Sequence, residues 1–166
     1  MEMTINAVTS SGNIHLDAIS PDGKWLAYVA DNNGGHGIFV RQLATGSVAQ
    51  VQAGTEGEIG GLTFSPDGNY LYFVKDEPGS NAGTLFQVPS IGGTSQQIIS
   101  DVDSPVTFSP DGKRFAFVRQ SPPVKSSNLM LANADGSGAR PLAVLHDPAY
   151  FSAQGPSWSP DGQIGR

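Results

Sequence analysis

Residues 20–29 read Ser-Pro-Asp-Gly-Lys-Trp-Leu-Ala-Tyr-Val, and the first four of these residues recur three more times along the chain. The tetrapeptide Ser-Pro-Asp-Gly begins at Ser20, Ser65, Ser109 and Ser159, so successive copies lie 45, 44 and 50 residues apart. One tetrapeptide at near-constant spacing is typical of a repeat protein. The chain is therefore expected to consist of structural units of about 45 residues each.

Each tetrapeptide has the composition of a tight turn between two antiparallel strands. Pro fixes φ near about −65° at the second turn position, and Asp suits the third. Gly then adopts the left-handed conformation that a three-residue hairpin requires. The aspartates of the four turns are assigned to this local architecture, and we do not expect them to converge on a catalytic site. These aspartates are Asp22, Asp67, Asp111 and Asp161.

Apolar segments surround the turns in a constant order. A short segment precedes each turn, at residues 16–19, 61–64, 105–108 and 155–158. A six-residue run follows the first three turns, at residues 25–30, 70–75 and 114–119. Third strands are expected over 38–43, 84–88 and 128–132, and weaker fourth strands over 48–51, 96–99 and 140–145. Four strands per repeat of this length match a β-propeller blade.

The run over residues 25–30 is apolar on both of its alternating faces, which indicates a strand buried on both sides. Stacked blades bury their middle strands in this way. A two-sheet sandwich is the structural alternative, but it does not predict one turn tetrapeptide every fourth strand. The aromatic residues near the turns are therefore predicted to pack between blades. They are Trp25, Phe64, Tyr70, Tyr72, Phe73, Phe108, Phe115, Phe117 and Trp158.

The sequence thus predicts an all-β fold, a partial β-propeller with three complete blades. The expected units are the final strand of a preceding blade over 1–13, blades over 14–55, 56–100 and 101–148, and the truncated start of a fourth over 149–166. Closing even four blades takes roughly 180 residues. We therefore expect a fragment of a propeller with about six to eight blades, whose open edges would allow self-association.

Composition narrows the classes of partner. The 166 residues carry a net charge of −6 and contain no basic stretch, so a nucleic-acid partner is not expected. The chain has no Cys, which excludes disulfides and thiolate chemistry. Its longest apolar run is far shorter than the roughly 20 residues of a membrane span.

Motifs that would indicate chemistry are mostly missing. The chain lacks a G-x-S-x-G elbow, a phosphate-binding glycine loop and the kinase signatures, so no catalytic and no cofactor-binding residue is predicted. His15, His36 and His146 fall at unrelated repeat positions, without metal-ligand spacing. Residues 31–34 and 101–103 offer oxygen ligands for Ca²⁺, but turn chemistry is the favoured interpretation. No metal site is predicted.

The phrases over residues 19–29 and 108–118, each centred on Ser-Pro-Asp-Gly-Lys, resemble the TolB-type, WD-like propeller repeat. The resemblance covers nearly the whole chain. It implies the propeller fold, and it is compatible with several settings: the periplasmic TolB protein, the gating propeller of prolyl oligopeptidase-type peptidases, and propellers attached to bacterial serine/threonine kinases or winged-helix regulators. The sequences of residues 8–13 and 101–108 are most similar to those of the kinase- or regulator-linked group.

The expected function is a non-catalytic sensor or binding module for a protein or small-ligand partner, as part of a larger bacterial protein. The candidate recognition loops span residues 31–37, 76–83, 120–127 and 146–155. The alternatives are a gating propeller whose peptidase domain lies outside this chain, and a TolB-type component of an envelope complex. An extracytoplasmic or periplasmic location is implied by the resemblance alone.

Overall fold

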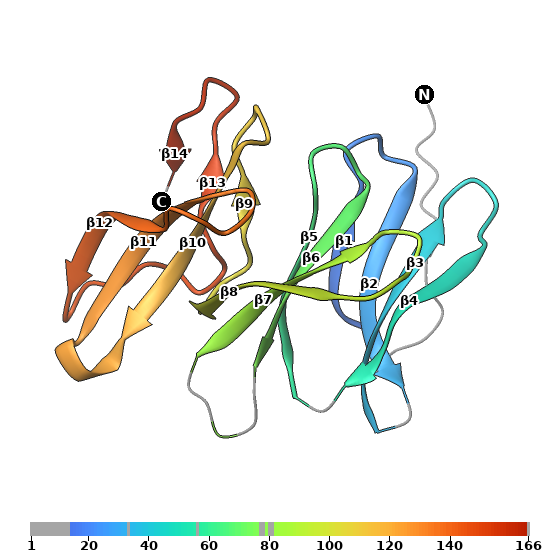
Figure 1. Cartoon of the computed structure of the whole chain (residues 1–166), viewed down its shortest axis with the longest axis horizontal. Coiled ribbons are helices and arrows are strands. Elements are labelled where there is room, and N and C mark those ends of the chain that lie inside the picture. The colour runs from blue at the N-terminus through green and yellow to red at the C-terminus, as the bar shows by residue number, and fades with distance from the viewer. Residues whose placement is uncertain (1–13, 33, 56, 77–78, 80–81, 166) are drawn as a thin grey trace, which may run out of the picture.

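The computed structural model describes residues 14–32, 34–55, 57–76, 79 and 82–165. Its first sheet contains four antiparallel strands in chain order (Figure 1). They are β1 (Ile14–Ile19), β2 (Trp25–Asn32), β3 (Gly35–Gln42) and β4 (Val48–Thr55). The second sheet repeats this order with β5 (Ile59–Phe64), β6 (Tyr70–Asp76), β7 (Gly83–Pro89) and β8 (Gln96–Val102).

The third sheet has the same topology, and a further strand pair follows it. The strands are β9 (Thr107–Phe108), β10 (Arg114–Ser121), β11 (Ser126–Asn133) and β12 (Arg140–His146), with a short 3₁₀ helix η1 (Pro122–Val124) after β10. The pair comprises β13 (Ser157–Trp158) and β14 (Ile164–Gly165). The predicted fold class is confirmed: the described residues form a partial β-propeller. The final strand of a preceding blade, predicted over 1–13, lies outside them.

Every blade has two ends with different connections. The Ser-Pro-Asp-Gly hairpins join the first and second strands of each sheet and lie at the upper edge of Figure 1. The ends of the second strands (β2, β6 and β10) and the starts of the third strands (β3, β7 and β11) lie toward the lower edge. We call these two ends the repeat end and the loop end.

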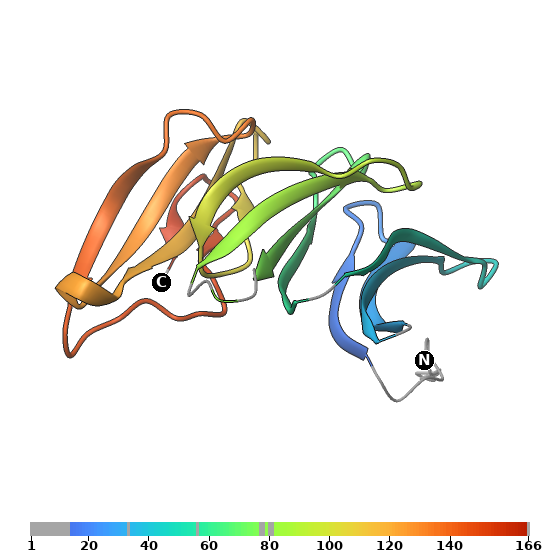
Figure 2. The same cartoon turned by 60° about the horizontal axis from the view of Figure 1, so that its bottom comes forward.

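The hydrophobic core lies between blades, and the second strands of blades 2 and 3, β6 and β10, bury both of their faces. In β6, Leu71 and Phe73 pack against blade 1 residues such as Val29, while the alternate residues Tyr72 and Val74 pack against blade 3. The sequence predicted this two-sided burial for residues 25–30, in β2. There Ala27 and Val29 are buried, but Leu26 and Tyr28 on the other face are only partly buried, so the prediction is confirmed for one face of β2 only. Figure 2 shows the sheets following one another across the molecule in chain order.

Hydrogen bonds also join the innermost regions of neighbouring blades, near their first strands. The Thr63 hydroxyl donates to the Val106 carbonyl at 2.8 Å, and the Trp158 indole N–H donates to the Thr107 carbonyl at 3.1 Å. Thr63 belongs to β5, and Val106 lies just before β9. Trp158 belongs to β13, and Thr107 lies in β9. Blade 3 is thus joined to blade 2 and to the β13–β14 pair by polar contacts as well as by apolar burial.

Two details differ from the sequence prediction. Trp25 and Tyr70, expected in the core, are 37% and 38% exposed because they open β2 and β6 at the repeat end, beside the turns. The paired strands of blade 1 also extend further toward the loop end than predicted. Residues 31–32 belong to β2 and residues 35–37 to β3, where a recognition loop over 31–37 was expected.

Candidate functional site

The repeat end is built from hairpins with one common hydrogen-bond pattern. In the first, the Ser20 hydroxyl donates to the Asp22 carboxylate at 2.6 Å and accepts the Trp25 backbone N–H at 2.9 Å. The Lys24 backbone N–H donates to the same carboxylate at 3.1 Å. Gly23 has φ +69°, the left-handed conformation predicted for the turn. The corresponding serine and aspartate are bonded to each other in all four turns.

These bonds decide the chemistry of the turn aspartates. The hydroxyl of the preceding serine, followed by a backbone N–H, holds the pKa of each of these carboxyls below its usual value. A carboxylate with a lowered pKa, and with one oxygen already accepting two hydrogen bonds, is a poor general acid or base near neutral pH. The turn aspartates, Asp22, Asp67, Asp111 and Asp161, are therefore structural acceptors.

A groove of about 350 Å³ lies between the first two Ser-Pro-Asp-Gly turns. Pro21 and Pro66 contribute to its lining, together with Trp25 and Ile91, of which Ile91 is 89% exposed. The two turns thus meet at one groove, which the sequence prediction of separate turns did not anticipate. Their aspartates also line it, while bonding within their own turns.

The hollow between the third and fourth turns has a different lining. It measures about 250 Å³, and Arg114 occupies the repeat position that Trp25 has in blade 1. The guanidinium carbon of Arg114 lies 5.9 Å from the centre of the Trp158 ring, within cation–π range. Arg114 itself lines this hollow, and the groove beside Trp25 offers the larger apolar surface of the two.

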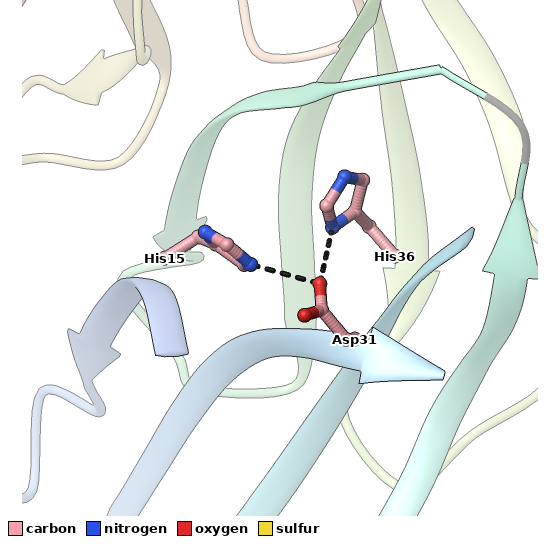
Figure 3. Close-up of side chains that lie close together, drawn as sticks. All are labelled: His15, Asp31 and His36. Atoms are coloured by element: carbon pink, nitrogen blue, oxygen red, sulfur yellow. Dashed lines mark hydrogen bonds and ion pairs between the residues drawn. The ribbon is translucent and has the colours of Figure 1, made fainter. Parts of the chain in front are cut away.

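The loop end of blade 1 brings together two histidines that are 21 positions apart in the sequence. His15 Nε2 lies 2.9 Å from Asp31 Oδ1, and His36 Nδ1 lies 3.4 Å from the same oxygen (Figure 3). The two imidazole rings are 5.0 Å apart, edge to face. Asp31 of β2 stands between His15 of β1 and His36 of β3, so the three side chains come from three adjacent strands.

Strand pairing explains this cluster. Asp31 and His36 face each other directly in the β2–β3 ladder. The β1–β2 register shifts between Ile14 and Leu16, so His15 sits at a bulge opposite Val29 and Ala30. Bulges re-aim a side chain relative to regular pairing. The sequence prediction separated the histidines because they fall at unrelated repeat positions without metal-ligand spacing. Strand pairing brings His15 and His36 together despite that spacing.

Other candidate metal ligands have partners already. The Arg119 guanidinium N–H group lies 2.9 Å from an Asp101 carboxylate oxygen, and the Gln120 backbone N–H donates to the Asp103 carboxylate at 2.7 Å. The pKa of Asp103 is raised, mainly because the carboxyl is partly buried and also because other acidic groups lie nearby. The hydrogen bond from Gln120 lowers the pKa and so opposes this shift. These contacts favour the structural interpretation of residues 101–103 over a Ca²⁺ site.

The remaining candidate residues are dispersed. His146 ends β12 in blade 3 and is exposed, away from the blade 1 cluster. The predicted recognition loop over 120–127 is partly regular, since it contains the end of β10, η1 and the start of β11. Within the described residues no helix is long and apolar enough to cross a membrane.

Four-stranded antiparallel sheets stacked over shared cores define a β-propeller protein. The model of the TolB β-propeller domain family matches residues 4–164, and the chain belongs to this family. The match covers every described blade.

Solved structures agree with this assignment. The chain superposes on a TolB-type protein of Agrobacterium tumefaciens with a TM-score of 0.73 and 26% identity, covering 95% of this chain and 58% of that one. For TolB of Acinetobacter baumannii the TM-score is 0.75 with 25% identity, covering 95% of this chain and 38% of that one. This chain therefore spans 58% and 38% of the lengths of these two TolB chains.

A curated relative, a WD repeat-containing protein of Synechocystis, is 40% identical over 57 residues, which are 34% of this chain and 15% of that protein. The propellers of an oligogalacturonate lyase and a dipeptidyl aminopeptidase are also similar, at 13% and 17% identity. At that level of identity the likeness concerns the fold alone.

Proposed function

We propose that this chain is a non-catalytic binding module of a larger bacterial protein, and that the groove at the repeat end of blades 1 and 2 receives a segment of a protein partner. The observation that carries the proposal is the exposed apolar lining of this groove, on a fold whose relatives include TolB proteins. Exposed apolar surface bounded by polar residues is typical of interaction sites.

The partner segment is defined by the chemistry of the lining. Trp25, Pro21 and Pro66 offer flat, rigid apolar surfaces, which lose little conformational entropy on binding. Asp22 and Asp67 flank these surfaces and stay ionised because their pKa values are lowered. The chain as a whole carries a net charge of −6. A segment with one large apolar side chain and neighbouring Lys or Arg residues complements this groove.

The role as a sensor attached to a kinase or regulator is one form of this proposal. A peptidase-gating role has no separate support in this chain, because the peptidase and lyase neighbours share the fold alone. We therefore argue for binding and leave the attached domain outside the proposal.

A displayed library of short random peptides tests the groove. Peptides selected on the wild-type chain are measured by fluorescence anisotropy against Ile91→Ser and Val124→Ser. Ile91 lines the groove at the repeat end, whereas Val124, 66% exposed, lies at the loop end of blade 3. We expect cationic-apolar peptides whose affinity falls about 10-fold with Ile91→Ser and stays unchanged with Val124→Ser. Equal binding to both variants would contradict the proposal.

A further inference from the structure

We propose that His15, Asp31 and His36 form a binding site for a divalent transition-metal ion at the loop end of blade 1. The site lies at the opposite end of the blade from the groove, so the inference stands apart from the proposed binding function. It rests on the distances between the three ligand atoms, on the two imidazoles and one carboxylate that supply them, and on the buried Nδ1 of His36 (Figure 3).

The separations of the ligand atoms suit a small ion. His15 Nε2, an Asp31 carboxylate oxygen and a His36 ring nitrogen all lie within 4.8 Å of one another. Ligand bonds of about 2.0–2.1 Å in tetrahedral geometry place neighbouring ligand atoms roughly 3.3 Å apart. The His36–Asp31 separation of 3.4 Å already fits, and the His15–Asp31 separation of 2.9 Å needs a small rotation of an exposed side chain.

The ligand types indicate which ions would bind. Two imidazoles and one carboxylate favour Zn²⁺, Ni²⁺ or Co²⁺, whereas Ca²⁺ and Mg²⁺ prefer six or more oxygen ligands. Three protein ligands leave one tetrahedral position open. His15 and Asp31 are 47% and 52% exposed, so water or a partner's ligand reaches that position from solvent.

His36 is arranged as a metal ligand rather than as a hydrogen-bond donor. Its Nε2 lies 3.6 Å from a Glu58 carboxylate oxygen, which favours a proton on that nitrogen. Nδ1 then keeps its lone pair, is shielded from solvent and has no hydrogen bond among the described residues. This lone pair faces the Asp31 carboxylate at 3.4 Å. Two facing acceptors repel, and a cation between them removes the repulsion.

Glu58 adds a positioning contact from the next blade. It lies just before β5, in the connection between blades 1 and 2, and is itself exposed. Metal-bound histidines commonly direct their second ring nitrogen at a carboxylate, which orients the ring. An ion at this site would therefore connect three strands of blade 1 with the boundary to blade 2.

The repeat supplies an internal comparison. Five residues before the turn serine, blade 1 has His15, whereas blades 2 and 3 have Gly60 and Ser104. The cross-strand pair Asp31–His36 corresponds to Asp76–Gly83 and Gln120–Ser127. The equivalent positions in blade 3 serve the backbone: the Ser104 and Ser127 hydroxyls accept N–H groups of Val118 and Phe151. Among the described blades, blade 1 alone has metal-binding side chains at all three positions.

Isothermal titration with ZnCl₂ tests the site, with Co²⁺ absorption spectra as a second readout of coordination. The variants are His15→Gln, His36→Gln and, as a matched control, His146→Gln, which removes the third histidine from an exposed strand end. We expect one Zn²⁺ per wild-type chain, affinity at least about 10-fold weaker in His15→Gln and His36→Gln, and no change in His146→Gln. The Co²⁺ bands should change in parallel, and CaCl₂ should give no heat.

Circular dichroism spectra of each variant separate loss of binding from loss of fold. Absence of Zn²⁺ binding to the folded wild-type chain would overturn the proposal. So would equal weakening by all three substitutions, because binding would then be scattered over surface histidines.

Discussion

The two ends of the blades follow opposite rules. At the repeat end, every blade has the same serine–aspartate hydrogen bond and a glycine with positive φ. At the loop end, equivalent positions hold His15, Gly60 or Ser104, and the cross-strand pairs differ from blade to blade. A feature repeated in all blades serves the fold that all blades share. Residues that bind a ligand or ion in one blade only are expected at positions where the blades differ in sequence.

Aspartates at the two ends differ in the same way. The turn aspartates have lowered pKa values because hydrogen-bond donors surround the carboxylate. Asp103, near the loop end of blade 3, has a raised pKa, mainly because it is partly buried. One residue type therefore stabilises the fold at one end and is costly in its ionised form at the other.

The largest expected loss of stability comes from placing in blade 2 the histidine that blade 1 has at the equivalent position. A side chain at Gly83 would meet Val74 Cγ1 at 2.5 Å and the Val102 carbonyl at 2.6 Å, before any atom beyond Cβ is added. We expect Gly83→His to lower the free energy of unfolding by roughly 3 kcal/mol. The reverse change, His36→Gly, should cost only about 1 kcal/mol. Urea unfolding measures both, and similar costs would contradict the comparison.

Ser65→Ala should give the next largest effect. The buried Ser65 hydroxyl donates to Asp67 and accepts the Tyr70 backbone N–H at 3.0 Å, so its removal leaves that N–H without its acceptor. We expect a loss of about 1–2 kcal/mol in the free energy of unfolding. Ser47→Ala, at an exposed β3–β4 turn, is the matched control and should change it by less than about 0.5 kcal/mol. Equal losses would show that the turn hydroxyl adds nothing specific.

Acid should weaken the repeat end. The turn aspartates have folded-state pKa values below 3.8, so their stabilising contribution is present above pH 3.8 and is lost as pH falls through the folded-state pKa. Thermal unfolding from about pH 5 to about pH 2 should show this loss, and Asp67→Asn should reduce its slope. If Asp67→Asn had the same dependence of melting temperature on pH as the wild type, Asp67 would not contribute to the acid sensitivity.

The smallest expected effect has the opposite sign. The folded-state pKa of Asp103 lies above 3.8, so its ionisation lowers stability as pH rises from 3.8 through the raised value. Asn can still accept the Gln120 N–H, so Asp103→Asn should leave the free energy of unfolding equal or slightly higher at neutral pH, by less than about 0.5 kcal/mol. A clear destabilisation would mean that the charge itself is needed, through Arg119.

The sequence could predict the repeat end because its chemistry is local. Ser20, Asp22 and Gly23 contain the donor, the acceptor and the backbone freedom of the turn within four residues. The apolar faces of residues 25–30 predicted burial on two sides. β6 shows this burial fully because a blade lies on each side of it, whereas β2 is fully buried on one face only. Exposure of Trp25 was missed, since hydrophobicity alone does not show which end of a strand opens to solvent.

The loop end could not be predicted in the same way. His15 and His36 meet through a bulge in β1 and a strand extension past residue 30, and neither has a clear sequence signal. Residues 31–37 are rich in Asn and Gly, which favours a loop in any reading based on propensity. Comparing equivalent repeat positions is the one signal that could have identified the site: His15 and His36 stand where blades 2 and 3 have Gly or Ser.

The most direct test compares two aspartates at opposite ends of blade 1. The melting temperature of the wild type, Asp22→Asn and Asp31→Asn is measured with and without a saturating excess of Zn²⁺. At about 100 times Kd, bound ion should raise the melting temperature by roughly 5 °C or more in the wild type and in Asp22→Asn. Asp31→Asn should show little or no shift. Equal shifts in both variants, or none in the wild type, would contradict the assignment of structure to the repeat end and metal chemistry to the loop end.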